Sequence, residues 1–283
     1  MKKVLIGITT RNRAAILPKA IRSALNQDYS NKEVAVFDDA STDETPNLCI
    51  EYPEVRWSRT DNNRGLIRTR NHLMQATDAD YYFSLDDDAW FLKDDEISYG
   101  VRVLDERPEV GALAYDILSP DFPNTANRIG PQKTHSIIGC GHMVRLSAVR
   151  DVGYYAPGLG NYGSEEQDLC IRLLDEKHEI LFLPGVHVWH ERTPIARDSD
   201  GQHTSAVCND LTFAFRRSPL SMLVWLLPGK VLSHLRFAVA HNLVKPCLKG
   251  IGMFLTGLPD LMSTRRPVRV SVYKEFRRRK HSV

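Results

Sequence analysis

The sequence has few cysteines, no internal repeat and no low-complexity linker. Its five cysteines are odd in number and scattered, and none form a C-x-x-C pair: Cys49, Cys140, Cys170, Cys208 and Cys247. This pattern argues against a disulfide framework and a zinc knuckle, and it fits a reducing cytoplasm. The 283 residues, of which 42% are hydrophobic, suffice for one sizeable globular domain, alone or with an accessory segment.

Long apolar runs are also missing. No run approaches the ~18 residues needed to span a bilayer. The longest candidate, Met222–Leu227, is followed by Pro228-Gly229-Lys230. The N-terminal apolar stretch is too short for a signal peptide and runs into Thr9-Thr10-Arg11. We therefore expect a buried first strand there and no membrane crossing.

Acidic residues are scarce in the last quarter of the chain. The net charge of +2 divides into −10 before Phe213 and +12 from Phe213 onward, where only Asp260 and Glu275 are acidic. The two parts are therefore expected to do different jobs.

The first 115 residues alternate between β-rich and helical patterns. Such alternation predicts a parallel sheet with right-handed crossovers, in which ligands bind beyond the carboxyl ends of the strands. Ser41-x-x-Glu44 and Ser164-x-x-Gln167 have the form of capping boxes. The expected strands are Val4–Thr9, Glu33–Asp38, Val55–Arg59 and Tyr81–Asp86; the expected helices are Ala15–Leu25, Thr42–Glu51, Leu66–Ala76 and Glu165–Glu176.

We expect one α/β domain over residues 1–212, in which the alternating pattern of residues 1–115 changes to shorter β-like runs over residues 116–212. Residues 213–283 read as a helical, basic extension, because apolar clusters broken by Pro, Gly and Lys replace the sheet pattern there.

Two polar clusters follow expected strands in the first half. Asp38 and Asp39 lie between an expected strand and the start of an expected helix. A carboxylate at such a position can accept hydrogen bonds from a base or ribose. Asn63-Arg64-Gly65 precedes a helix carrying Arg70, and arginine there suits phosphate binding. The alternatives are simple helix capping and a solvated basic face.

The sharpest signal is Asp86-Asp87-Asp88 after the apolar run Tyr81-Tyr82-Phe83. Three adjacent carboxylates at the end of a buried strand repel one another unless positive charge lies among them. A hard divalent cation bridging to diphosphate oxygens would resolve the repulsion. A solvated acidic turn is the alternative.

Two further clusters lie in the second half. Glu165-Glu166-Gln167-Asp168 enters a helix, where acids favour the helix dipole and where a carboxylate could also deprotonate an acceptor hydroxyl. His190 follows an apolar run, as a strand-end ligand would, although a lone histidine is more often structural.

Taken in order, these clusters resemble the inverting glycosyltransferase family 2, with its GT-A fold. The matching landmarks run from Ile6 to about Glu191: Thr9-Thr10-Arg11-Asn12-Arg13, Asp38–Asp43, Asn63-Arg64-Gly65 with Arg70-Asn71, the Asp-x-Asp motif Asp86-Asp87-Asp88, and Glu165–Leu169.

The resemblance implies that residues 1–212 form a catalytic domain, with a nucleotide-binding half at 1–115 and an acceptor-binding half at 116–212. It also implies roles for individual residues. The nucleotide sugar would contact Thr9, Arg11, Asp38, Asp39, Asn63, Gly65, Arg70, Asp86 and Asp87, with Asp39 at the base. Asp88 and His190 would hold Mn²⁺ or Mg²⁺. Gly141 and Asp168 would contact the acceptor.

The resemblance also implies the reaction. The base would be Glu166, where the family usually has Asp, so Glu165 remains a rival. The acceptor oxygen would displace a nucleoside diphosphate of UDP or dTDP type in line, with inversion. By analogy, the acceptor is a surface polysaccharide or glycolipid.

Three alternatives stay open. A sugar nucleotidyltransferase usually has a Gly-rich loop after strand one, which Thr9–Arg13 lacks. An inactive sugar-nucleotide-binding assembly subunit also stays possible, because Glu166 stands where the family usually has Asp. Nucleic-acid binding is disfavoured, because the basic tail has few aromatics and the front is acidic.

The basic tail predicts a peripheral location at the inner face of the cell membrane. Apolar clusters at Leu220–Leu227 and Ile251–Leu258 with Arg277-Arg278-Arg279-Lys280 suit an anionic lipid surface. A helical cap on the catalytic domain is the alternative.

Overall fold

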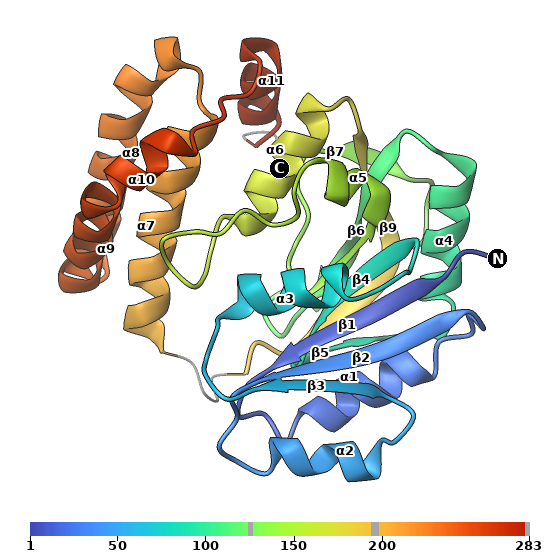
Figure 1. Ribbon diagram of the computed structural model, residues 1–283. Helices are drawn as coiled ribbons and strands as arrows, with labels where there is room; N and C mark the ends of the chain where they lie inside the picture. Colours follow the sequence, from blue (N-terminus) through green and yellow to red (C-terminus); the bar gives the residue numbers. More distant parts are fainter. Residues whose placement is uncertain (124–126, 194–197, 281–283) are drawn as a thin grey trace. The chain divides into compact units, whose positions relative to one another are not determined.

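The computed structural model describes residues 1–123, 127–193 and 198–280 (Figure 1). These form two compact units. The first contains Met1–Tyr154 and Glu176–Ala196, and the second contains Tyr155–Asp175 and Arg197–Val283. The expected boundary between residues 212 and 213 falls inside a single helix of the second unit, Ser199–Arg217.

The first unit is built around one nine-stranded sheet with the order β3-β2-β1-β4-β8-β6-β9-β5, in which β7 also pairs with β9. Strands β1 to β4 are parallel, and β8 runs antiparallel between β4 and β6. The strands are β1 (Val4–Thr10), β2 (Lys32–Asp39), β3 (Arg56–Thr60), β4 (Tyr81–Asp86), β5 (Ala89–Phe91), β6 (Val110–Leu118), β7 (Gln132–Thr134), β8 (Gly141–Arg145) and β9 (Glu179–His190).

Strand register brings the ends of β1, β2 and β4 together. Thr9 lies opposite Phe37 on one side and Asp86 on the other, and Thr10 lies opposite Asp38. Every residue of β1 is buried, as expected for a parallel strand covered on both faces. The expected strands and their carboxyl edge are therefore present.

Helices cover both faces of this sheet. The helix α1 (Leu17–Leu25) packs on one face and α3 (Leu66–Gln75) on the other (Figure 1). The remaining helices of this unit are α2 (Leu48–Glu51), α4 (Glu96–Glu106) and α5 (Leu146–Asp151). The observed architecture is the mostly parallel, helix-flanked sheet that the sequence predicted.

The helix expected over Thr42–Glu51 was wrong. A 3₁₀ turn over Thr45–Asn47 leads into the short α2 instead. The reason is that the polar side chains here fasten the loop after β1: Ser41 Oγ accepts from Asn12 N at 2.9 Å, and Asp43 Oδ2 from Ala14 N at 3.2 Å. Ser41 therefore does not cap a helix.

The second unit is helical. Its helices are α6 (Glu165–Asp175), α7 (Ser199–Arg217), α8 (Leu220–Ala240), α9 (Val244–Thr256), α10 (Leu258–Ser263) and α11 (Val270–Lys280). Val207, Cys208 and Leu211 of α7 pack with Cys247 and Phe254 of α9 as its core. Ser164, at the start of α6, has a φ of 68° rather than the extended backbone of an ordinary N-cap.

The apolar run Met222–Leu227 is part of a longer helix. Helix α8 continues through Pro228 for 21 residues, with a mean hydropathy of 1.3 and 11% of that window buried. By length and composition it could span a membrane, and it is the one such helix among the described residues. Core helices of soluble proteins can pass the same test.

A buried acid ties α4 to the sheet. Glu96 is fully buried; its Oε1 accepts from His187 N at 3.3 Å, and its carbonyl oxygen accepts from the Tyr115 hydroxyl at 2.9 Å. Burial, followed by the neighbouring Asp95 carboxylate, raises the pKa of Glu96 to about 7. The native state therefore binds more protons than the unfolded chain between about pH 4.5 and 7, and stability falls as the pH rises through that window.

Glu96→Gln removes this titration while keeping the acceptor for His187 N. Relative to Glu96→Gln, we expect the wild-type free energy of unfolding to fall by on the order of 2 kcal/mol between pH 5 and pH 8. Urea unfolding of both proteins at the two pH values measures this. Glu106→Gln, at an exposed position of the same helix, is the control; a constant gap between wild type and Glu96→Gln would contradict the prediction.

Candidate active site

Charged side chains converge where β4 and β9 end. Asp86 is the last residue of β4, and His190 is the last residue of β9. Strand β5, directly after Asp88, pairs antiparallel with β9 so that Ala89 lies opposite His190. The Glu191 N–H donates to the Asp88 carbonyl at 2.9 Å. Two segments a hundred residues apart in sequence are thus held together by backbone pairing.

The Asp88 carboxylate is buried and surrounded by donors. Its Oδ2 accepts from Arg13 Nη1 at 3.3 Å and from Thr193 N at 3.1 Å. Its Oδ1 lies 3.2 Å from His190 Nε2. This accounts for a buried charge, and it brings together the two residues that the sequence assigned to a metal.

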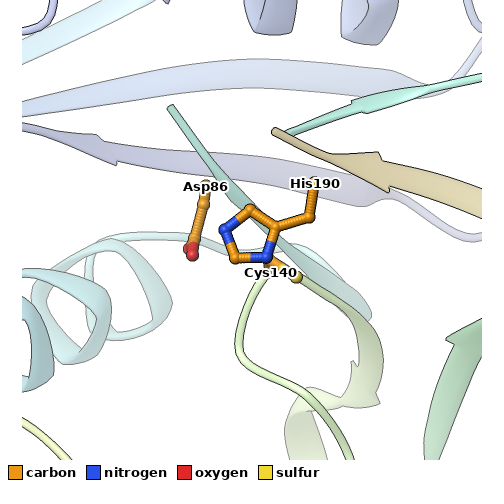
Figure 2. A group of neighbouring side chains, drawn as sticks. All are labelled: Asp86, Cys140 and His190. Carbon is orange, nitrogen blue, oxygen red and sulfur yellow. The ribbon is translucent and has the colours of Figure 1, made fainter. Parts of the chain in front are cut away.

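A possible metal-binding group lies beside this pair (Figure 2). Ligand atoms of Asp86, Cys140 and His190 all lie within 4.8 Å of one another. A carboxylate oxygen, an imidazole nitrogen and a thiol sulfur are all metal-ligand atoms. The residues present therefore fit a divalent cation. Burial raises the pKa of the Cys140 thiol well above its usual value.

Sequence reasoning missed Cys140 as a member of this group. The five cysteines of the chain form no spacing motif. Cys140 stands 50 residues before His190 and 54 residues after Asp86 in the sequence. The one available signal was its place in the Gly-rich segment Ile138–His142, which the sequence analysis assigned to the acceptor half.

Arg70 lies inside the protein and is 1% exposed. Its Nη2 donates to Asp86 Oδ1 at 2.5 Å and to the Gly139 carbonyl at 3.2 Å. These bonds compensate the Asp86 charge and fix the backbone next to Cys140. Arg70 therefore positions the acidic cluster; its expected contact with the nucleotide stays a prediction.

Asp39 fastens the loop before α3 to the end of β2. Its Oδ1 accepts from Arg64 N at 2.7 Å and its Oδ2 from Gly65 N at 2.9 Å. Asn63 Oδ1 also accepts from Gly65 N, at 3.0 Å. Gly65 has a φ of 84°, which glycine adopts without strain. The two clusters expected to share the nucleotide, Asp38–Asp39 and Asn63–Gly65, are thus brought together.

Asp38 is 1% exposed and is held by its own neighbours. Its Oδ1 accepts from Ser41 N at 2.9 Å, and its Oδ2 accepts from Arg59 Nη1 at 3.0 Å. Arg59 also reaches the Ser41 carbonyl at 2.8 Å. The carboxylate therefore shapes the turn after β2, and its expected contact with the donor stays a prediction.

Polar atoms at the end of β1 are buried. The Thr9 hydroxyl has no hydrogen-bond partner among the described residues, whereas the Thr10 hydroxyl interacts with the Asp87 carboxylate. Asp87 is 9% exposed, and burial raises its pKa to about 7, although Arg13 acts in the opposite direction. Buried hydroxyls are normally satisfied, so the Thr9 hydroxyl suits a polar ligand at this edge. Arg11 is exposed beside it.

Gly141 and His142 lie in the sheet rather than in an open loop. A Cβ at Gly141 would stand 2.4 Å from Ile117 Cδ1, so packing accounts for the glycine. His142 is fully buried, its Nδ1 lies 2.8 Å from the Ile138 carbonyl, and burial lowers its pKa to about 3. The neutral ring thus holds the loop that carries Cys140. An acceptor contact by Gly141 stays a prediction.

The second unit carries the candidate bases. Glu165 is buried and Glu166 is half-buried at the start of α6. Asp168, expected at the acceptor, accepts from Arg172 Nε at 2.6 Å and from Arg217 Nε at 2.5 Å. Burial opposes its charge, but both arginines lower its pKa below the usual value. Asp168 thus holds α6 against α7, and its expected contact with the acceptor stays a prediction.

Comparison with known sequences decides the family. A sequence model described as glycosyl transferase family 2 matches residues 5–153, more than half of the chain. The chain belongs to glycosyltransferase family 2. The match covers β1 to β8, and therefore includes Asp39, Gly65 and the Asp86–Asp88 cluster.

Relatives of this family 2 chain include proteins of bacterial surface polymers. A putative colanic acid biosynthesis glycosyl transferase from Escherichia coli is 32% identical over 29% of this chain and 31% of its own. A GalNAc(5)-diNAcBac-PP-undecaprenol β-1,3-glucosyltransferase from Campylobacter jejuni is 31% identical over 31% of this chain and 30% of its own. The matches span less than half the length of these relatives.

Solved structures confirm the GT-A fold. Staphylococcus aureus TarS, residues 1–349 in complex with UDP-GlcNAc, is 15% identical with a TM-score of 0.65, covering 93% of this chain and 82% of its own. The mannosyltransferase PcManGT from Pyrobaculum calidifontis, in complex with GDP-Man and Mn²⁺, is 16% identical with a TM-score of 0.61, covering 92% and 88%.

Proposed function

We propose that this protein transfers a sugar from a nucleoside diphosphate sugar, of UDP or dTDP type, to an acceptor hydroxyl with inversion. The observation that carries the proposal is the Asp86–Asp88 cluster facing His190 beside the unsatisfied Thr9 hydroxyl. A donor diphosphate with a cation complements this edge in charge and in hydrogen bonding. The complexes of TarS with UDP-GlcNAc and of PcManGT with GDP-Man support a nucleotide-sugar donor.

The donor site is assigned to the carboxyl edge of β1, β2 and β4. Asp39 shapes the pocket for the base through the loop at Gly65, and the Thr9 hydroxyl and exposed Arg11 contact the donor. Arg70 holds Asp86 in place through its 2.5 Å bond. These residues bind and orient the donor; neither a nucleotidyltransferase nor an inactive subunit is favoured by the family assignment.

Mn²⁺ or Mg²⁺ would be held by Asp88 and His190, with Asp86 and Cys140 adjacent. When bound, such a cation offsets the negative charge that develops on the departing nucleoside diphosphate. Arg13 Nη1 lies 3.3 Å from Asp88 Oδ2 and offsets the charge of that carboxylate. The Mn²⁺ in the PcManGT complex supports a metal.

Glu166 is the proposed base, with Glu165 as its rival. A base takes the proton of the acceptor hydroxyl as its oxygen forms the bond to the anomeric carbon and the bond to the diphosphate oxygen breaks. One displacement inverts that carbon. The half-buried position of Glu166 suits a carboxylate that must reach an incoming acceptor, whereas Glu165 is buried.

The proposed acceptor is a saccharide of a surface polysaccharide or glycolipid, carried on a lipid diphosphate. The acceptor printed in the name of the Campylobacter jejuni relative is of this kind, and the Escherichia coli relative is named for colanic acid. Such acceptors place the enzyme at the cytoplasmic face of the cell membrane.

Asp88→Asn tests the donor site. We expect metal-dependent hydrolysis of the preferred nucleotide sugar to fall about 100-fold, because the cation loses a charged ligand and the developing charge is no longer offset. A panel of nucleotide sugars with Mn²⁺ or Mg²⁺ measures it. Asp78→Asn, an exposed acid paired with Lys3 at the opposite end of the sheet, is the control. No donor binding by wild type would sink the proposal and favour the assembly subunit.

Glu166→Gln and Glu165→Gln separate the two candidate bases. The substitution at the true base should lower transfer to acceptor about 10²–10⁴-fold while leaving donor affinity within about twofold, because only proton removal is lost. The variant with the substitution at the other glutamate should keep most of the wild-type transfer rate. Acceptor transfer and donor affinity are measured on both variants. Equal, small effects on transfer would reject a base on α6.

A peripheral membrane contact is proposed for the basic segment. Helix α11 carries Arg277 and Arg278; the side chains of Arg279 and Lys280 lie outside the described residues. Each basic residue near an anionic surface contributes about 1 kcal/mol. The full chain should therefore sediment with anionic vesicles at low salt and dissociate as salt is raised. Equal sedimentation with zwitterionic vesicles would reject the electrostatic contact.

A further inference from the structure

The second unit contains a cavity of about 650 Å³ between α6, α7, α8 and α11. Its walls are mainly apolar and aromatic, with one exposed arginine at the end of α11: Phe213, Met222, Trp225, Leu226, Phe276 and Arg277. None of the twelve residues that line it is acidic. A half-open apolar cavity with a cation at its rim complements an amphiphile that has an anionic head group.

One face of α8 forms the cavity wall. Met222, Trp225, Leu226, Gly229 and Ser233 line it, and their spacings of three and four residues place them on a single helix stripe. A Cβ built at Gly229 meets no atom within 4 Å. Gly229 therefore widens the cavity at the middle of its wall, where any other residue would fill it.

The cavity's charge is unbalanced. Lys230 also lines it, but its Nζ is bound to both oxygens of Asp210 at 2.6 and 2.7 Å. Arg277 has no ion-pair partner among the described residues, and no Asp or Glu occurs between Asp210 and Asp260. Arginine suits phosphate because its planar fork of donors matches phosphate oxygens.

The cavity also adjoins the candidate base. Gln167 of α6 lines it, one residue beyond Glu166 and two beyond Glu165. An acceptor whose lipid occupies the cavity would therefore begin its saccharide close to the start of α6. Val239 of α8 and Leu248 of α9 are exposed outside the cavity lining. In this arrangement they would contact the surrounding bilayer.

We propose that this cavity binds the isoprenoid diphosphate portion of a lipid-linked acceptor, a proposal that rests on the function proposed above. The isoprenoid chain packs among Met222, Trp225 and Leu226, and the diphosphate contacts Arg277. The site selects the carrier of the acceptor, while the donor is bound by the first unit.

Farnesyl diphosphate, a short soluble isoprenoid diphosphate, serves as the probe in calorimetric titration of the full chain in EDTA. We expect it to bind more tightly than farnesol or inorganic diphosphate, because only the whole molecule uses both the apolar wall and Arg277. Gly229→Trp should weaken its binding at least 10-fold. Arg277→Ala should weaken farnesyl diphosphate about fivefold and leave farnesol unchanged.

Gly252→Trp is the matched control. Gly252 lies in α9, outside the cavity lining, and a Cβ there also meets no atom within 4 Å. It should bind farnesyl diphosphate as wild type does, which separates blockage of the cavity from a general effect of tryptophan on a helix. Asp88→Asn should also bind it normally, which excludes the donor site as the place of binding.

Equal affinity of Gly229→Trp and wild type for farnesyl diphosphate would overturn the proposal, as would no binding by wild type. Loss of vesicle sedimentation in Gly229→Trp with unchanged farnesyl diphosphate binding would assign the cavity to bilayer lipid instead. Nucleotide-sugar binding distinguishes the two proposals: Gly229-dependent farnesyl diphosphate binding without any donor binding would reject the enzyme function alone. Donor binding without Gly229-dependent farnesyl diphosphate binding would reject the cavity proposal alone.

Discussion

A buried carboxylate requires compensating positive charge or hydrogen-bond donors, and the Asp88 carboxylate organises the first unit on this condition. Its three partners come from two distant segments: Arg13 follows β1, while His190 ends β9 and the Thr193 backbone N–H lies just beyond it. Each must be in place for the charge to be tolerated at 3% exposure. The condition that stabilises the fold therefore also assembles the ligands of the proposed metal site.

The same reasoning explains why Arg70 is buried. Asp86 stands two residues from Asp88, and Arg70 supplies a charge-assisted bond to it from the opposite face of the sheet edge. Arg70 also holds Gly139, and His142 holds Ile138, so the loop that carries Cys140 is fixed from both sides. The proposed metal ligands are held in place in this way by residues that would not themselves ligate.

Local patterns were sufficient to predict much of this. The β1 to β4 strands, the helices α1, α3 and α6 and the meeting of Asp39 with Gly65 follow from hydrophobic period and strand direction, since parallel strands end at one edge. The GT-A fold and family 2 followed from the order of the motifs, and both are confirmed. The pairing of β5 with β9, which places His190, has no local signature.

Local patterns are insufficient where a side chain's partner is distant in sequence. Ser41 has the local form of a cap, yet its hydroxyl accepts from Asn12 N in the loop after β1. Asp168 stands in a catalytic-looking motif, and Arg217, 49 residues away, binds its carboxylate, so its acceptor contact stays a prediction. Pro228 usually interrupts a helix because it removes a backbone donor, yet α8 continues through it. Long-range contacts of Ser41 and Asp168, and the continuation of α8 past Pro228, are not visible in the residues next to them in the sequence.

The anchoring of Gly65 by Asp39 has a consequence for engineering donor specificity. Both carboxylate oxygens bind consecutive backbone N–H groups, and the glycine between loop and helix holds a φ of 84°. Inserting or deleting a residue between β3 and α3 would shift those donors out of register. If the proposed donor site is engineered, side-chain exchange at exposed loop positions such as Asn62 keeps this backbone anchor, whereas a grafted loop of another length removes it.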